Sequence, residues 1–418
     1  MKNLNLARNV ILVSGCSKDA IYDLENGDLY QISKQASSLI KEFLASNQLQ
    51  SNNSVAERTA IQFLLDKGLL ERSHDKSSSP TIEFIEEGSK VSFAWIEVTK
   101  GCNLTCVHCY ENSSPHLLGD SLSLDDAKYV LDRLVQLGVS SIQFIGGEPL
   151  VHKQLKDMIV YARDRFPHIE VYTNGLLITD DWIDFFSKNK ISVAVSLHSY
   201  DSREHDKVTN KVGSYNRVTR TIEKLKLKNI RHRVSGVRVS GVDFGVKGDK
   251  DVDIREDVVR LVGRAQPEMV SYELFSKKAI TKNRFMRKLS KQFVSKNIGT
   301  HNCFGSKIYI DTNLQVYPCV MERRVSHGNL KDADNDSVIR EDIRSMNKDH
   351  IEGCKDCELR YACFDCRPDA NGNGLYEKPW YCTYDHSVGK WIDPKDAYNL
   401  LFKNTNGKSS ELISLVEV

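Results

Sequence analysis

The sequence carries almost no net charge. Its 58 Lys and Arg residues are balanced by 56 Asp and Glu residues, which leaves a formal charge of +2. A protein with such a balance has no strong electrostatic attraction to nucleic acid or to an anionic membrane surface. The sequence also lacks a run of about 18 apolar residues, the length that a membrane-spanning helix needs. We therefore expect no nucleic-acid partner and no membrane partner.

We also expect no secretion signal. Residues 13–16 (VSGC) have the form of a lipoprotein cleavage box, but the apolar run before them covers only residues 10–13, which is too short for the core of a signal peptide. The chain has eleven cysteines in 418 residues, and it is much larger than the small secreted proteins that disulfides stabilise. We therefore expect a cytoplasmic protein whose thiols stay reduced and bind metal.

Three of the cysteines stand close together in residues 98–110 (VTKGCNLTCVHCY), with the spacing C-x3-C-x2-C. They follow an apolar run at 93–99, and Gly101 breaks that run before the first thiol. Three thiolates are one fewer than a structural zinc site or a fully ligated [4Fe–4S] cluster needs. A metal centre held by Cys102, Cys106 and Cys109 therefore keeps one coordination position open. The alternative is three buried thiols whose spacing is a coincidence.

This motif resembles that of the radical S-adenosylmethionine (SAM) family, whose members carry C-x3-C-x-Φ-C with a residue Φ that is usually aromatic. His108 stands at the Φ position and Tyr110 follows the last cysteine. The resemblance implies a [4Fe–4S] cluster on Cys102, Cys106 and Cys109 whose open iron binds SAM, with His108 and Tyr110 beside the cofactor.

Strands and helices alternate after residue 90, which predicts a parallel sheet curled into an α/β barrel. The resemblance implies a partial (β/α)6 barrel over residues 90–300. A helix is expected at 124–137, and the charged stretch 241–257 is expected to be a solvated loop. Active sites of such barrels lie at the carboxyl ends of the strands. The strand candidates are 93–99, 141–145, 169–173, 191–197, 233–239 and 269–275.

Further strand ends carry residues that the resemblance assigns to SAM. The sequence GGEP follows the second strand candidate, and in the family this motif binds the amino end of the methionine moiety. Ser196 resembles the ribose-contacting serine of the family, and Asn174 stands in the usual turn after the third strand. The chain lacks the family's arginine near His205, so the ligand of the SAM carboxylate stays open. The GGEP residues are Gly146, Gly147, Glu148 and Pro149.

The first 80 residues predict a small winged-helix-like module. Asn26-Gly27 favours a tight hairpin turn within 21–32, helices are expected at 36–44 and 55–67, and a short strand starts at 69. A polar linker follows at 73–80. The module resembles the leader-recognition domains of peptide-modifying radical SAM enzymes, and residues 9–33 resemble the opening of maturases from grasp-with-spasm peptide systems. The alternative is a module that only packs against the enzyme.

Seven more cysteines fill the last third of the chain. A zinc ribbon would use only four of them. The region 301–400 resembles the SPASM domain, followed by a tail at 401–418, and this implies two auxiliary [4Fe–4S] clusters. The inner cluster is one thiolate short, and His301, Asp365, water or a substrate sulfur could complete it. The outer cluster would be held by Cys354, Cys357, Cys363 and Cys382, and the inner one by Cys303, Cys319 and Cys366.

Together the resemblances imply an enzyme that reductively cleaves SAM and oxidatively modifies a ribosomally made precursor peptide, by a crosslink, a thioether or a similar bond. They also imply a flavodoxin or ferredoxin as electron donor. One alternative is an anaerobic sulfatase maturase, but Val320 stands where those relatives carry an aspartate. The other is a non-catalytic, metal-stabilised protein that binds peptides.

Overall fold

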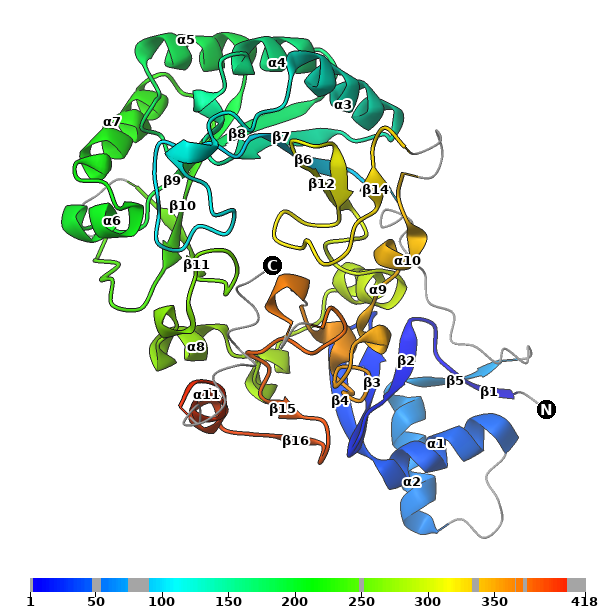
Figure 1. The fold of residues 1–418 in the computed structure, drawn as a ribbon. Helices are drawn as coiled ribbons and strands as arrows, with labels where there is room; N and C mark the ends of the chain where they lie inside the picture. The colour runs from blue at the N-terminus through cyan, green and yellow to red at the C-terminus, as the bar shows by residue number, and fades with distance from the viewer. Residues whose placement is uncertain are drawn as a thin grey trace.

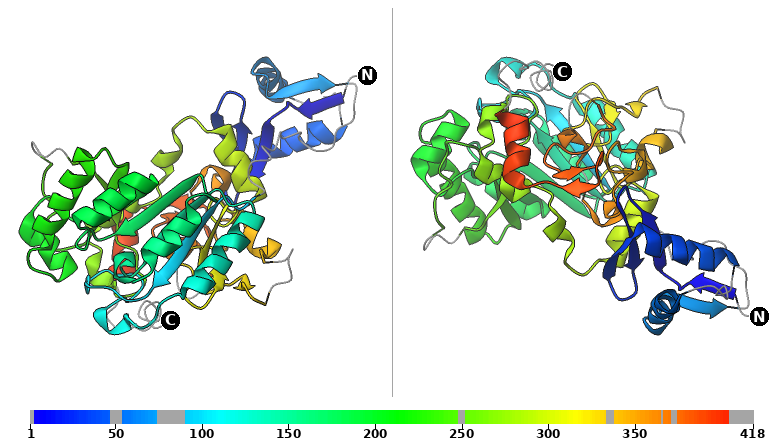
Figure 2. Two further views of the ribbon diagram at one scale, coloured as in Figure 1. Left: turned by 90° about the horizontal axis from the view of Figure 1, so that it is seen from above. Right: turned by 90° about the horizontal axis from the view of Figure 1, so that it is seen from below.

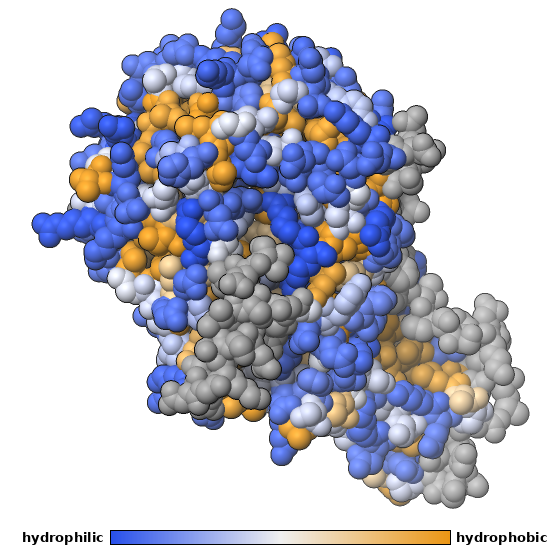
Figure 3. All heavy atoms as spheres, in the orientation of Figure 1, coloured by the Kyte–Doolittle hydropathy of each residue, from blue (hydrophilic) through white to orange (hydrophobic). Residues whose placement is uncertain are grey.

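A computed structural model describes residues 3–46, 54–73, 90–247, 252–332, 338–364, 366–370 and 374–403 (Figure 1). The expected linker at 73–80, apart from its first residue, lies outside the described residues, and so do most of the expected tail and Asp365. None of the described helices is both long and apolar enough to cross a membrane. The face in Figure 3 is largely hydrophilic, with apolar residues in scattered patches.

The central element is an open sheet of nine strands in the order β11-β10-β9-β8-β7-β6-β12-β13-β14. Strands β6 to β12 run parallel, and β13 and β14 add antiparallel pairs at one edge. The sheet does not close, so the predicted partial barrel is confirmed. The strands are β6 (Phe93–Thr99), β7 (Ser141–Gly146), β8 (His168–Thr173), β9 (Ser192–Ser196), β10 (His232–Arg238), β11 (Ile254–Val258), β12 (Lys307–Ile310), β13 (Gln315–Tyr317) and β14 (Gly328–Asn329).

The helices that connect the parallel strands cover the outer face of the sheet (Figure 1). The predicted helix at 124–137 is confirmed as α3, where Ser123 accepts a hydrogen bond from the backbone N–H of Asp126 and so caps the helix, a contact worth about 1 kcal/mol. Val130 and Leu131 of α3 pack against Phe144 in the main core. The outer helices are α3 (Leu124–Gln136), α4 (Leu155–Ala162), α5 (Asp180–Asn189), α6 (Ser202–Thr209) and α7 (Ser214–Leu227).

The sixth barrel strand is not where the sequence predicted it. In the stretch 269–275, Met269 is the last residue of a short 3-10 turn, η4 (Pro267–Met269), and helix α8 (Tyr272–Lys278) begins at Tyr272. The helix begins there because the side chain of Ser271 accepts a hydrogen bond from the backbone N–H of Leu274 and so caps it. The sixth strand is β11, most of which lies in the stretch 241–257 that was expected to be a solvated loop. Among the described strands β11 pairs only with β10, and its charged side chains Arg255 to Asp257 are exposed.

The N-terminal module contains the predicted hairpin and helices. Strands β3 and β4 pair from Asp23 and Asp28 outward, and Gly27 takes the positive φ of 71° that the turn requires. The module lies at one end of the molecule, away from α5 to α7 (Figure 2). Its elements are β1 (Asn3–Leu6), β2 (Val10–Ser14), β3 (Lys18–Asp23), β4 (Asp28–Ser33), α1 (Lys34–Ser46), α2 (Val55–Asp66) and β5 (Leu70–Ser73).

The cysteine-rich region lies between the barrel and the module (Figure 1). It is built mostly of loops and short turns, and the fully buried Tyr22 of β3 donates its hydroxyl to the carbonyl of Glu358 at 2.8 Å. This contact joins the module to the cysteine-rich loops. The elements are η5 (Lys282–Phe285), α9 (Lys291–Gly299), α10 (Glu341–Arg344), η6 (Lys348–His350), η7 (Arg360–Ala362), η8 (Arg367–Asp369), β15 (Tyr384–Asp385), β16 (Lys390–Trp391) and α11 (Pro394–Phe402).

Candidate functional site

The loop that carries the first three cysteines follows β6, at the carboxyl end of a barrel strand. Backbone hydrogen bonds hold it on two sides, from the N–H of Cys102 to the carbonyl of Ser114 at 3.1 Å and from the N–H of Val107 to the carbonyl of Val208 at 3.0 Å. A cavity of about 620 Å³ opens above the loop. Nine of the predicted site residues line this cluster cavity: Cys102, Cys106, Cys109, His108, Tyr110, Gly146, Gly147, Asn174 and Ser196.

Two thiols of this loop, those of Cys102 and Cys106, are unstable as thiolates on their own. Burial raises the pKa of Cys102 to about 12, with the carboxylate of Glu148 adding to it. Burial also raises the pKa of Cys106 to about 12, and the neighbouring thiolates of Cys102 and Cys109 raise it further. A bound metal centre removes this cost, because its positive charge deprotonates coordinating thiols. The grouping of the three thiols, and the cost of ionising Cys102 and Cys106 without a partner, therefore fit a cationic centre in this cavity.

The two glycines of GGEP are required by the cysteine loop itself. A Cβ on Gly146 would overlap the carbonyl oxygen of Thr99, and a Cβ on Gly147 would overlap that of Gly101. The N–H of Gly147 instead donates to the Thr99 carbonyl at 2.8 Å, and the N–H of Glu148 donates to the Gly101 carbonyl at 2.9 Å. Both glycines therefore let the end of β7 lie directly against the start of the cysteine loop.

Glu148 and Pro149 are not among the residues that line the cluster cavity. The Glu148 carboxylate is fully buried and accepts hydrogen bonds from the backbone N–H of Leu150, the hydroxyl of Thr173 and the backbone N–H of Asn174. Burial raises its pKa to about 7, although these donors oppose the rise. The side chain of Asn174 then donates to Asn103 at 2.8 Å. In this structure Glu148 therefore positions Asn174 against the cysteine loop.

Sequence reasoning missed two histidines beside the cavity. The ring of His198 lies 4.7 Å from that of His108 and 5.7 Å from that of His205. His198 Nδ1 accepts the N–H of Val237, and His205 Nδ1 accepts the N–H of His198, so the proton of each neutral ring sits on Nε2. Burial lowers the pKa of His108 and of His205 to about 4. The three rings thus form a neutral wall of the cluster cavity.

The sequence also gave no sign of the role of Arg264, which lies after β11. Its Nε donates to the carbonyl of Cys106 at 2.9 Å, its Nη1 donates to the carbonyl of Ser113 at 2.8 Å, and its backbone N–H donates to the carbonyl of Cys109 at 2.9 Å. Its buried Nη2 has no hydrogen-bond partner within the part of the chain that the structure describes. Arg264 therefore holds the cysteine loop from one side, and its Nη2 is a donor beside the cavity that a ligand can use.

Gly263 allows Arg264 to hold the loop in this way, which leads to a prediction. It has a φ of 64°, and a Cβ there would overlap the carbonyl oxygens of Cys109 and Tyr110. We expect Gly263→Ala to displace the loop and to lower the iron bound per chain after anaerobic reconstitution. Gly241→Ala is the matched control, since Gly241 has a φ of 75° but open space around it. Equal iron content in the two variants would contradict this role of Gly263.

The second group of cysteines divides electrostatically into two sets. Burial raises the pKa of Cys319 to about 11, with Cys303 adding to it, and burial raises the pKa of Cys366, with Cys319 among the further causes. In the other set, burial raises the pKa of Cys357, with Cys363 and Cys382 contributing, and burial raises that of Cys382, with Cys363 contributing. Thiols that perturb one another lie close together. These two sets do not include Cys354, which lies with Cys303 and Cys319 in one apolar cluster, whereas Cys357 and Cys382 lie in another. The two ligand sets expected from the sequence stay a prediction.

The candidates for a further inner ligand differ in position. His301 Nδ1 accepts the backbone N–H groups of Cys303 and Phe304, so that nitrogen faces its own chain. Val320 lines the cluster cavity with an apolar side chain where sulfatase maturases carry an aspartate. Among the described residues, no three His, Cys, Asp or Glu side chains gather closely enough for a single metal ion.

Residues 96–261 match the family model of the Radical SAM superfamily. The chain is 35% identical over 144 residues to the antilisterial bacteriocin subtilosin biosynthesis protein AlbA of Bacillus subtilis (34% of this chain, 32% of AlbA). It is 31% identical over 136 residues to the sporulation killing factor maturation protein SkfB of the same organism (32% and 33%). The chain thus spans about a third of the length of these two relatives. It is 24% identical over 339 residues to an AdoMet-dependent heme synthase of Methanosarcina barkeri (70% and 95%).

The fold is similar to that of native anSMEcpe with bound AdoMet, with a TM-score of 0.54 and 16% identity over 77% of this chain and 98% of that chain. The structure of the same protein with a bound Cp18Cys peptide gives a TM-score of 0.53 at 18% identity, over 78% of this chain and 99% of that chain. Identity this low shows the fold alone. The sequence match and the cysteine loop together lead to one conclusion: residues 96–261 of this chain form a domain of the Radical SAM superfamily.

Proposed function

We propose that this chain is a radical SAM enzyme that reductively cleaves SAM and oxidatively modifies a ribosomally made precursor peptide. The observation that carries the proposal is the set of three thiols on one loop at the carboxyl end of β6, all lining one cavity in a matched radical SAM domain. A [4Fe–4S] cluster on these thiols would supply the electron that cleaves SAM to a 5′-deoxyadenosyl radical, the hydrogen-abstracting species.

Several residues around the cavity hold SAM in this proposal. Asn174 and Ser196 offer polar groups at neighbouring strand ends, and the neutral rings of His198 and His205 offer Nε2–H donors. Arg264 is the candidate partner of the SAM carboxylate, because its unpartnered Nη2 is buried at the edge of the same cavity. A guanidinium already fixed by two carbonyls loses little side-chain entropy when it binds a carboxylate.

Seven of the eight remaining thiols hold two auxiliary [4Fe–4S] clusters in this proposal. The two electrostatic sets support an inner cluster on Cys303, Cys319 and Cys366 and an outer cluster on Cys357, Cys363 and Cys382, to which the sequence pattern adds Cys354. In such a cluster each thiolate would bind its own iron. None of the eleven cysteines, all of which are described, forms a disulfide. In this proposal the chain works in a reducing cytoplasm, and a flavodoxin or ferredoxin is its electron donor.

The peptide partner is supported by the relatives whose names describe bacteriocin biosynthesis and killing-factor maturation. A sulfatase maturase is not favoured, because Val320 gives the cavity no carboxylate at the position where those relatives have one. The edge of the module sheet offers a binding site for an extended leader. Within the described residues, β4 pairs with β3 only, so its outer edge keeps backbone donors and acceptors for strand addition.

This proposal predicts protection of β4 by the precursor. The peptide encoded by a short open reading frame beside the gene would be added to the full chain, and amide hydrogen exchange would be followed by mass spectrometry. Amides of 28–33 should exchange at least about tenfold more slowly, since strand pairing shields the outward N–H groups. The buried strand β9 is the internal control. If the peptide binds but the amides of 28–33 exchange at an unchanged rate, the leader does not pair with β4.

A further inference from the structure

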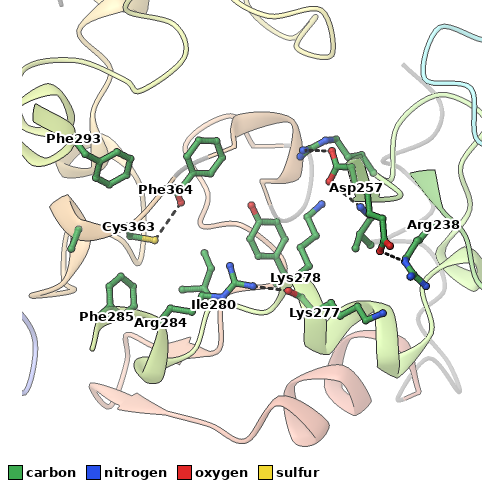
Figure 4. Close-up of a pocket in the computed structure, with 15 residues that line it drawn as sticks. Arg238, Asp257, Lys277, Lys278, Ile280, Arg284, Phe285, Phe293, Cys363 and Phe364 are labelled. Carbon is green, nitrogen blue, oxygen red and sulfur yellow. Dashed lines mark hydrogen bonds and ion pairs between the residues drawn. The ribbon is translucent and has the colours of Figure 1, made fainter. Parts of the chain in front are cut away.

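A second cavity, of about 540 Å³, lies beside the cluster cavity between β11, α8, η5, α9 and the loop around Cys363 (Figure 4). Four residues line both cavities, so the two adjoin at the end of β11: Glu256, Asp257, Val258 and Arg260. We call this second space the side cavity. Its position next to the cluster cavity makes it a place where part of a bound substrate can lie while another part reaches the reactive centre.

The side cavity has an apolar side and a charged side. Phe285, Phe293 and Phe364 gather around Cys363 on one side, and Figure 4 shows Arg238 and Asp257 on the opposite side. Phe364 is 52% exposed although it is aromatic. Exposed apolar surface that continues a cluster of aromatic side chains is typical of a binding site. The aromatic side therefore fits a large apolar side chain of a ligand, beside the Cys363 thiol that is proposed to hold the outer cluster.

The charged side carries more positive than negative groups. Arg238 is paired with Glu256, Arg260 with Asp257, and both Arg260 and Lys278 reach the buried Asp369. Lys277 is paired with Glu273, outside the cavity. These ion pairs involve four carboxylates, two of which do not line the cavity. The cavity wall carries five cations: Arg238, Arg260, Lys277, Lys278 and Arg284.

Arg284 is the one of these five cations that has no part in the ion pairs above. Its Nη2 donates to the carbonyl of Lys277 at 2.7 Å, and no carboxylate of the described residues pairs with it. Arg284 is exposed at the mouth of the side cavity, so it can add a carboxylate partner without breaking an existing ion pair. The charged side therefore favours an anionic group close to the aromatic side.

The side cavity also lies next to the N-terminal module. Phe293 and Ala362 of its wall pack in one apolar cluster with Leu24 and Leu29 of the β3–β4 hairpin. The N–H of Leu289 donates to the carbonyl of Gly27 at 2.8 Å, and Lys288 pairs with Asp28 at the start of β4. A chain that leaves the module at β4 therefore meets the side cavity before it meets the cluster cavity.

We propose that the side cavity binds a segment of the substrate peptide in which a large apolar side chain stands next to an acidic one. This inference rests on the proposed function and adds the chemistry of the segment between the leader and the modified residue. The apolar side chain lies on the three phenylalanines and the acidic one pairs with Arg284. A cavity of this volume suits one or two side chains, whereas a docked electron-donor protein would need a far larger surface.

The test measures fluorescence anisotropy of a labelled pentapeptide, Gly-Phe-Glu-Glu-Gly, with the reconstituted full chain and without SAM or electron donor. The neutral peptide Gly-Phe-Gln-Gln-Gly should bind about tenfold more weakly, the loss expected for one partly exposed charge pair. Arg284→Glu should weaken binding of the acidic peptide by about tenfold or more. Lys277→Glu should also weaken binding of the acidic peptide. This second variant leaves the Arg284 side chain in place, so a loss in both variants cannot be explained by the removal of the hydrogen bond between Arg284 and the end of α8. Arg217→Glu, on the exposed face of α7, is the matched control and should leave binding unchanged.

Three results would overturn the inference: equal affinity for the acidic and neutral peptides, unchanged affinity in both Arg284→Glu and Lys277→Glu, or an equal loss in Arg217→Glu. Displacement of the probe by added flavodoxin would assign the surface to the electron donor instead. SAM cleavage is measured separately, on the unaltered chain without peptide. A chain that binds the probe but cannot cleave SAM would refute the proposed function, and a chain that cleaves SAM but ignores the probe would refute only the side cavity.

Discussion

Replacing Cys102, Cys106 and Cys109 together by Ala is expected to abolish 5′-deoxyadenosine formation from SAM under dithionite. The three thiols are the cysteines of the loop that opens on the cluster cavity, and no other described cysteine lines that cavity. Without them the proposed cluster has no ligands there. The iron bound per chain should fall by about one third, because two further clusters remain.

Cys16→Ala is the control for the triple variant, because Cys16 is exposed and belongs to none of the three proposed ligand sets. It should keep both its iron and its SAM cleavage. Full 5′-deoxyadenosine production by the triple variant would contradict the assignment of the SAM-cleaving cluster to this loop. Loss of all the iron would instead contradict the independence of the auxiliary clusters.

Arg264→Gln is expected to lower SAM cleavage by at least about 100-fold. The change removes a cation and one arm of the fork that holds the carbonyls of Cys106 and Ser113, and hydrogen bonds from a charged donor contribute about 1.5–3 kcal/mol each. It also removes the Nη2 donor proposed for the SAM carboxylate. SAM binding, measured by equilibrium dialysis, should weaken together with turnover.

Arg264→Lys separates charge from geometry. A lysine keeps the positive charge but lacks the planar fork that reaches two carbonyls at once. We expect it to recover little of the SAM affinity that Arg264→Gln loses. The control is Arg217→Gln on α7, which is exposed and distant in sequence from the site. Unchanged SAM affinity in Arg264→Gln, with normal iron content, would exclude Arg264 as the partner of the SAM carboxylate.

The sequence was sufficient for elements whose pattern is local. The apolar face of α3, the Asn26-Gly27 turn and the cysteine loop after β6 each depend on neighbouring residues, and each stands where it was predicted. The stretch at 269–275 misled because its apolar residues have no fixed period, while Ser271 caps a helix there. Strand β11 was missed because an edge strand can expose charged side chains.

The candidate site shows the same division. Cysteine spacing and GGEP located the cavity, because each motif lies within a few residues of the end of its own strand, β6 for the cysteines and β7 for GGEP. Arg264 could not be found in this way, since it reaches Cys106 and Ser113 from more than 150 residues away. His205 could not be found either, because it joins the site by accepting a hydrogen bond from the backbone N–H of His198. That contact depends on how helix α6 packs beside the end of β9. The hydrogen bonds of buried Glu148 could not be predicted from the sequence, because their donors Thr173 and Asn174 lie at the end of a different strand.

The central claim is that SAM cleavage by this chain is coupled to modification of a precursor peptide. The most direct test incubates the reconstituted chain anaerobically with SAM, dithionite and the peptide encoded beside its gene, and then examines the peptide by mass spectrometry. The account predicts a peptide lighter by two hydrogens for each bond formed, with at least one 5′-deoxyadenosine for each event. Formation of 5′-deoxyadenosine at the same rate with and without peptide, and a peptide of unchanged mass, would contradict it.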